Sequence, residues 1–156
     1  MRDVVVKLYI DVLDVLQRGR IEGALFGFDN GGADGSLHLG TDHLASAIAL
    51  GESVVWAVNS LECEAYVNIE DLELPDWMEA QHVRVNDHDY WRARVVGTPS
   101  DAPYAMTLAI GRYGKRIRYA DRLRFIPRPP ELAAPSAPPV GHDAPVRRYR
   151  AKGGAR

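Results

Sequence analysis

The segment 116–125 (RIRYADRLRF) carries an arginine at each of four even-numbered positions. Residues two apart on a β-strand project from the same face. The pattern therefore predicts a strand with guanidinium groups on one face and apolar side chains on the other. Tyr113 lies just before this strand, and arginines beside a stacking ring suit the phosphates and bases of a nucleic acid. The basic residues of this region are Arg112, Lys115, Arg116, Arg118, Arg122 and Arg124.

The same arginines have a structural alternative, because acidic residues alternate along an earlier predicted strand. In the segment 61–69, Glu62 and Glu64 lie on the polar face, and Glu70 follows directly. If the two strands are neighbours in a sheet, arginines and glutamates form cross-strand ion pairs worth about 0.2–1 kcal/mol each. We expect this pairing to neutralise most of the arginine row.

A tail of different composition begins at residue 127. Residues 127–145 contain seven of the ten prolines, and the last twelve residues contain five Lys and Arg. A proline-rich segment with few apolar side chains favours an extended, unfolded chain. The basic end, which includes Arg147, Arg148 and Arg150, either binds a polyanion, solubilises the chain, or docks as an extended peptide on a partner protein.

Charge is divided unevenly along the chain. Residues 1–100 hold 7 Lys and Arg against 17 Asp and Glu, a net charge of −10, whereas residues 101–156 hold 12 against 4, a net charge of +8. The division predicts an acidic partner for the basic end or pairing between the two halves. Charged residues interrupt the N-terminal apolar runs and only one cysteine is present, so we expect no signal peptide, no internal disulfide and a cytoplasmic location.

Residue patterns of known active sites are missing from the sequence. We find no G-x-S-x-G, no phosphate-binding loop and no dinucleotide-binding motif. His38, Asp42 and His43 are of metal-binding types, but their spacing does not place them on one face, so we assign no metal and no cofactor. Cys63 is predicted to face inward as a small apolar residue. Trp77, among acidic residues, is either half-buried under a loop, which we favour, or exposed as the anchor of a protein interface.

Periodicity predicts the elements that position these residues. Polar residues at positions 3, 7, 11, 14 and 18 follow the helical period, and Gly19 comes next, so a helix is predicted over residues 3–18. A short helix is predicted over Asp42–Leu50, with Thr41 as its N-cap. Strands are predicted at 20–29, 54–58, 61–69, 83–85, 89–96, 104–110 and 116–125.

This order of elements favours an α+β fold, in which a mainly antiparallel, curved sheet packs on the N-terminal helix. A partly open β-barrel is the second choice. The length of 156 residues suffices for one core. Residues 1–126 are therefore predicted to form a single domain, followed by a disordered, proline-rich and basic tail over residues 127–156.

The missing motifs and the charge division together favour a non-catalytic interaction or regulatory protein. Its predicted partner is another protein or a second copy of itself, and no membrane. The alternative is a nucleic-acid-associated protein that uses the basic strand and tail. A second alternative is a small metal-dependent enzyme with a histidine–aspartate site.

Overall fold

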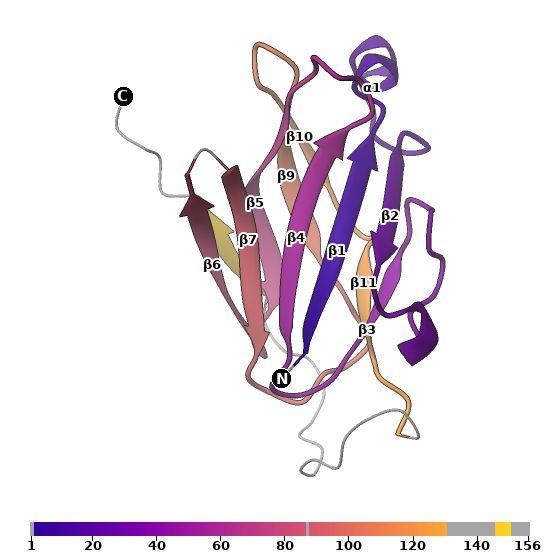
Figure 1. Cartoon of the computed structure of the whole chain (residues 1–156), viewed down its shortest axis with the longest axis vertical. Helices are drawn as coiled ribbons and strands as arrows, with labels where there is room; N and C mark the ends of the chain where they lie inside the picture. The colour runs from indigo at the N-terminus through magenta and orange to yellow at the C-terminus, as the bar shows by residue number, and fades with distance from the viewer. Residues whose placement is uncertain (1, 87, 131–145, 151–156) are drawn as a thin grey trace.

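The computed structural model describes residues 2–86, 88–130 and 146–150 of the chain. Most of it is sheet, with one α-helix, so the predicted α+β class is confirmed. The strands form three sheets, and none of them closes into a barrel. A five-stranded sheet is the front layer in Figure 1, and strands of the other two sheets lie behind it.

The five-stranded sheet has the strand order β2-β1-β4-β7-β6. Its central pair, β1 and β4, is parallel, and its other pairs are antiparallel. The strands are β1 (Asp3–Ile10), β2 (Leu25–Asp29), β4 (Ser53–Ser60), β6 (Met78–Val85) and β7 (His88–Val95).

The second layer contains a four-stranded sheet, β10-β9-β5-β12, and a three-stranded sheet, β3-β11-β8. The β3–β11 pair is parallel. The five-stranded and three-stranded sheets are therefore mixed, whereas the four-stranded sheet is antiparallel throughout, so the prediction of a mainly antiparallel sheet holds in part. The strands are β3 (Ala45–Ile48), β5 (Val67–Pro75), β8 (Ala102–Pro103), β9 (Ala105–Ile110), β10 (Lys115–Tyr119), β11 (Arg124–Pro127) and β12 (Val146–Arg150).

The core lies between the two layers and is rich in aromatic side chains. Trp56 of β4 and Phe125 of β11 are fully buried, with ring centroids 6.1 Å apart. Tyr104 stacks on Phe125 at 4.5 Å, and burial raises the pKa of its hydroxyl. Side chains from both layers interdigitate here, as in other two-sheet packings.

The predicted N-terminal helix is wrong over its first half. Residues 3–10 form strand β1, and only Val12–Arg18 form the helix, α1. A spacing of four is even, so Asp3 and Lys7 also lie on one face of a strand, while Val4, Val6 and Leu8 are buried on the other. Helix α1 ends at Gly19, which adopts φ 70°, as the sequence predicted.

Three further predictions are corrected by the strand boundaries. Residues 42–50 contain strand β3 and no helix, because all four residues of β3 are buried in a sheet. Strand β5 begins at Val67, so Cys63 lies in a preceding turn and is exposed. The predicted strand over 116–125 is divided into β10 and β11, and Asp121 between them has φ 66°.

Part of the predicted disordered tail is a strand. Residues 146–150 form β12, which pairs with β5 antiparallel to it. In Figure 1 this strand, in yellow, lies behind β6 and β7. The remainder of the predicted tail after residue 130 lies outside the described residues. No helix within the described ranges is long and apolar enough to cross a membrane.

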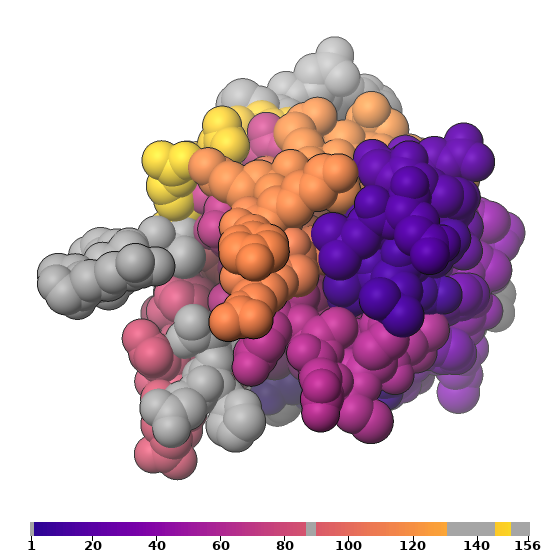
Figure 2. Space-filling model, turned by 90° about the horizontal axis from the view of Figure 1, so that it is seen from above, coloured from indigo at the N-terminus to yellow at the C-terminus, as the bar shows by residue number. Residues whose placement is uncertain are grey.

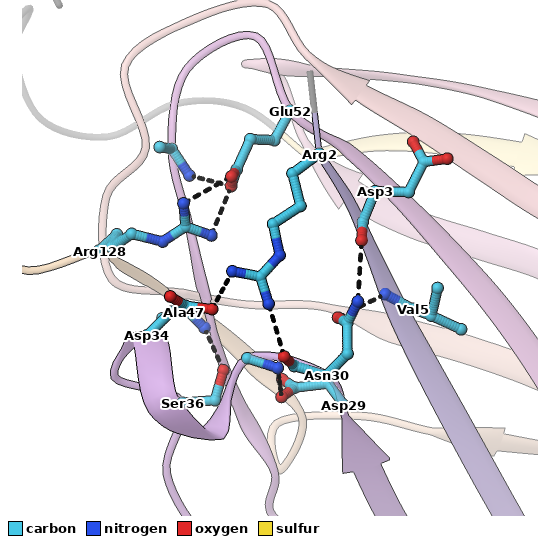
Figure 3. Close-up of polar contacts among 12 residues, drawn as sticks. Arg2, Asp3, Val5, Asp29, Asn30, Asp34, Ser36, Ala47, Glu52 and Arg128 are labelled. Carbon is cyan, nitrogen blue, oxygen red and sulfur yellow. Dashed lines mark hydrogen bonds and ion pairs between the residues drawn. The ribbon is translucent and has the colours of Figure 1, made fainter. Parts of the chain in front are cut away.

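Polar contacts fasten the first residues of the chain (Figure 3). Arg2 forms an ion pair with Asp34 and donates to the carbonyl of Asn30 at 2.7 Å. In the same region, Arg128 forms a buried, two-pronged pair with Glu52 at 2.6 and 2.9 Å. These contacts fix both the start of β1 and the segment that leaves β11.

At the opposite end, α1, the turn before β5 and the turn between β9 and β10 lie side by side (Figure 2). Glu62 of the first turn accepts hydrogen bonds from the backbone N–H groups of Val12 and Leu13, both at 3.1 Å. Partial burial raises the pKa of Glu62, but the Ser60 hydroxyl and these backbone donors outweigh it and lower the pKa to about 2. Glu62 therefore caps the helix and holds it to the sheet.

Candidate functional site

A buried carboxylate, Asp71 of β5, lies at the centre of the predicted basic surface. Its side chain has no solvent exposure. The pairing of β5 with β9 shifts register between Ile69 and Asp71, so Glu70 is the extra residue of a β-bulge. Without the bulge, Asp71 and Ile69 would share one face. The bulge instead leaves Ile69 in the core and turns Asp71 to the outer face of the four-stranded sheet.

Three arginines converge on Asp71 from the two edges of this sheet. Arg116 of β10 and Arg148 of β12 donate to its Oδ2 atom at 3.4 and 3.1 Å. The Oδ1 atom is buried and accepts no hydrogen bond from the described residues, and Nε of Arg150 lies 3.4 Å from it. A carboxylate removed from water requires such cationic partners.

Small side chains on β9 give the arginines room to cross the sheet. Ala109 of β9 is the register partner of Arg116, and Thr107 is the partner of Arg118. Arg116 reaches beyond Ala109 to Glu70 at 2.5 Å, and Arg118 reaches Glu73 at 2.7 Å. Hydrogen bonding to the Glu73 carboxylate, together with its negative charge, raises the pKa of Arg118. Charged hydrogen bonds of this kind are stronger than neutral ones.

Strand β12 presents different side chains to the two sides of the sheet. Arg148 and Arg150 lie on the outer face and reach Asp71. Tyr149, between them, points inward, is half-buried and donates its hydroxyl to the carbonyl of Met78 at 3.1 Å. Backbone pairing with β5 runs from Val146 to Arg150. The site therefore holds an extended strand by its backbone, by one inward ring and by two outward guanidinium groups.

Among the described residues, the other predicted basic side chains form no ion pair with Asp71. Arg122 pairs with Asp42 at 3.1 Å, and Arg124 pairs with Asp101 at 2.7 Å. Desolvation raises the pKa of Asp42, but the hydrogen bonds from His43 and from the backbone N–H of Gly23, together with the charge of Arg122, outweigh it and lower the pKa. Within the part of the chain that the structure describes, three predicted basic residues have no ion pair, namely Arg112, Lys115 and Arg147.

The expected pairing of the arginine row with carboxylates is present, but mostly with other partners than predicted. Glu70 does bind Arg116, whereas Glu62 caps α1 and Glu64 has no ion pair among the described residues. Sequence reasoning missed Asp71 and Glu73. Their alternation with apolar residues in the segment 70–74 (EDLEL) was the available signal, and the bulge concealed which face each residue takes.

Trp77 does not lie on an exposed interface. Its side chain is buried, and its ring lies 5.8 Å from that of Phe125. The turn between β5 and β6 folds the ring inward, and the N–H groups of Val96 and Gly97 donate to the Trp77 carbonyl. This burial argues against the alternative of an exposed interface anchor and agrees with the favoured interpretation, in which the ring lies under a loop.

The predicted histidine–aspartate group consists of His38, Asp42 and His43 in the described structure. Nδ1 of His43 lies 2.9 Å from Asp42, and the rings of His38 and His43 are 4.8 Å apart. Among the described residues, no three or more His, Cys, Asp or Glu side chains are grouped so that they could hold a metal ion.

Comparison with known proteins places the chain by family and fold. A family model described as "Domain of unknown function (DUF8788)" matches residues 2–116. A similar solved structure is that of an inclusion body protein (PixA) from Burkholderia cenocepacia J2315, with a TM-score of 0.61 and 12% identity over 80% of this chain and 90% of that one. At this identity the likeness concerns the fold alone. No curated protein matches the sequence significantly.

Proposed function

From the premise that the chain belongs to the family described as a domain of unknown function, DUF8788, we propose that it is a non-catalytic interaction protein. Its binding surface is the edge of β5, and its ligand is an extended, arginine-bearing segment of a protein. The chain's own residues 146–150 occupy this edge in the structure. The single observation that carries the proposal is the convergence of arginines on the fully buried Asp71.

The arrangement has the parts of a strand-addition site. An exposed sheet edge supplies backbone hydrogen bonds, and alternate side chains of the added strand supply specificity. Here the outward positions require a cation for Asp71, and the inward position accepts the ring of Tyr149. The family match ends at residue 116, so it includes β5 but not β12. The match therefore covers the receiving edge and not the strand that fills it.

Ion pairing favours a protein ligand over the nucleic-acid alternative. Arg116, Arg118 and Arg148 already face carboxylates on the same surface. A phosphate backbone binding here must displace those carboxylates and lie close to them, which costs electrostatic energy. A basic peptide, in contrast, is attracted by these carboxylates when the chain's own strand β12 does not occupy the β5 edge.

A peptide-binding experiment on the full-length chain tests the proposal. The double substitution Arg148→Ala with Arg150→Ala weakens the chain's own strand and frees the edge. A fluorescent peptide with the sequence of residues 146–150 and a neutral flank is titrated into this variant, and anisotropy is measured at about 150 mM salt. We expect saturable binding of the peptide to this variant. Binding to the wild-type chain is expected to be weaker, because its own residues 146–150 occupy the β5 edge and compete with the peptide.

Two matched controls decide the outcome. Adding Asp71→Asn to the double variant is expected to abolish peptide binding, because the buried charge is gone. A peptide with alanine in place of both outward arginines is expected not to bind. Binding that is unaffected by Asp71→Asn refutes the site. Tight, salt-dependent binding of a single-stranded oligonucleotide in place of the peptide supports the nucleic-acid alternative instead.

A further inference from the structure

A second surface, independent of the β5 edge, is the outer face of the five-stranded sheet. The side chains of β1 alternate strictly, so Val5, Lys7 and Tyr9 point away from the core. On the neighbouring β2, Phe26 and Phe28 are 36% and 42% exposed. No element of the described chain lies in front of this face in Figure 1. Contiguous exposed apolar side chains of this kind mark interaction surfaces.

The opposite part of the same face is charged and hollow. An open groove of about 500 Å³ lies over β4, β6 and β7. Arg92 in this groove donates to Asp3 at 3.1 Å and to Ser53 at 3.3 Å. Arg94 has no ion pair among the described residues and pairs in register with Glu79. The groove is lined by Ser53, Glu79, Ala80, Gln81, Arg92 and Arg94.

We propose that this face binds a second copy of the chain, with the two outer faces in contact. The two copies are related by a twofold axis that is parallel to β4 and lies midway between the two sheets. Two sheets that stack in this way lie about 10 Å apart with their strands roughly aligned. The axis places β4 over β4, β1 over β7 of the second copy, and β2 over its β6. A twofold interface must be self-complementary, because each contact occurs twice.

Charge on the face satisfies this requirement. The register places Asp3, Ser53 and Arg94 in one row across the sheet, with Ser53 between the other two. Rotation about β4 therefore brings Asp3 of one copy over Arg94 of the second copy. The Asp3 side chain is 49% exposed and lies at the edge of the groove, so it can bind the second copy's Arg94 while keeping its contact with Arg92.

The apolar side chains satisfy it as well. Phe28 on β2 is the register partner of Lys7, and Phe26 is the partner of Tyr9. On the far edge, Val83 and Val85 of β6 follow the same outward alternation as Glu79 and Gln81, and Val85 is 50% exposed. The twofold rotation places Phe26 and Phe28 of one copy over Val85 and Val83 of the second copy. The large rings at the β2 edge therefore contact the smaller side chains at the β6 edge.

The size of the face is sufficient for a stable dimer. Five strands at a spacing of about 4.8 Å are about 24 Å wide, and strands of eight residues are about 27 Å long. The projected area of about 650 Å² underestimates the accessible area of a rough surface. It therefore approaches the about 800 Å² that each partner buries in a stable interface.

Sedimentation equilibrium of the full-length chain between about 1 and 200 μM tests the proposal. The wild-type chain is expected to form dimers, and Phe28→Lys to raise the dimer dissociation constant about tenfold or more. Phe28 is 42% exposed and packs on Tyr9 at the sheet edge, so the variant is expected to remain folded with a small loss of melting temperature, which calorimetry checks. Asp3→Arg and Arg94→Asp are each expected to weaken the dimer, and the double charge exchange to restore it. Glu64→Arg, an exposed acid off this face, is the matched control.

Three results would overturn the inference. One is a wild-type chain that is monomeric at 200 μM. Another is a dimer that is unaffected by Phe28→Lys, which shows that the copies meet elsewhere. The third is a charge exchange whose double variant is as weak as the single ones, which excludes the twofold arrangement. Failure of the β5-edge peptide assay leaves this measurement unchanged, because the two surfaces share no residue.

Discussion

Replacing Asp71 by asparagine removes the negative charge at the centre of the arginine cluster and keeps the shape of the side chain. The arginines around it remain 48% to 68% exposed, so water solvates them when the carboxylate is lost. Asp71 itself has no exposure, so loss of an arginine leaves a buried charge with fewer partners. Charged hydrogen bonds contribute about 1.5–3 kcal/mol, and solvent at the arginine side reduces this to about 1–2 kcal/mol per pair.

A double-mutant cycle measures this coupling directly. The free energy of unfolding in urea is determined for the wild-type chain, Asp71→Asn, Arg148→Ala and the double variant. Arg148→Ala is expected to cost about 1–2 kcal/mol beside the carboxylate and less than about 0.5 kcal/mol beside the amide. The coupling energy, which is the difference between these two costs, is therefore expected to be about 0.5–2 kcal/mol.

The exposed pair of Asp101 and Arg124 provides the control cycle. Its two side chains are 60% and 39% exposed, and exposed pairs contribute about 0–0.5 kcal/mol. A coupling between Asp71 and Arg148 no larger than that of this control refutes the reasoning, because burial of the carboxylate would then have no energetic consequence for β12.

Three further predictions concern the fold. Glu62→Gln is expected to lower the free energy of unfolding at pH 7 by about 1 kcal/mol. Because the pKa of Glu62 falls from 4.5 to about 2 on folding, this difference is present above about pH 4.5 and disappears as the pH falls toward 2. Thermal melts of both chains between pH 2 and 7 measure it. Arg128→Ala leaves the buried Glu52 carboxylate without its cation and is expected to cost about 3 kcal/mol in urea unfolding, whereas an unchanged midpoint contradicts the buried pair. Gly97→Ala places a Cβ atom 2.7 Å from the Cβ of Trp77, so calorimetry is expected to show a loss of about 1–3 kcal/mol, and a wild-type melting temperature argues against this packing.

Local patterns in the sequence predicted some elements well and others ambiguously. The alternation in residues 89–96 and 104–110 gave strands that the structure contains as β7 and β9. The first residues of the chain were ambiguous, because a polar residue at every fourth position fits both a helix and a strand. Strand β1 is selected by its pairing with β4, whose residues lie about 50 positions further along. Such distant pairing overrides local propensity and leaves no local signal.

The candidate site shows the same limit. The arginine row and its neutralisation by carboxylates could be predicted, since both charges alternate in the sequence. The role of Asp71 could not, because a one-residue bulge at Glu70 decides which face it takes. The strand at residues 146–150 was concealed by the proline-rich composition before it, since composition describes the average of a segment and not the five residues that pair with β5.

Amide hydrogen exchange of residues 146–150 in the full-length chain tests the central claim most directly, because it reports on β12 without any added ligand. Because β12 pairs with β5 alone, only alternate N–H groups of residues 146–150 point toward β5. We predict that these inward-pointing amides exchange at least about tenfold more slowly than in a free peptide of the same sequence, and that Asp71→Asn removes most of this protection. Exchange at the rate of the free peptide in the wild-type chain would contradict the claim that a buried carboxylate holds an arginine strand at the edge of β5.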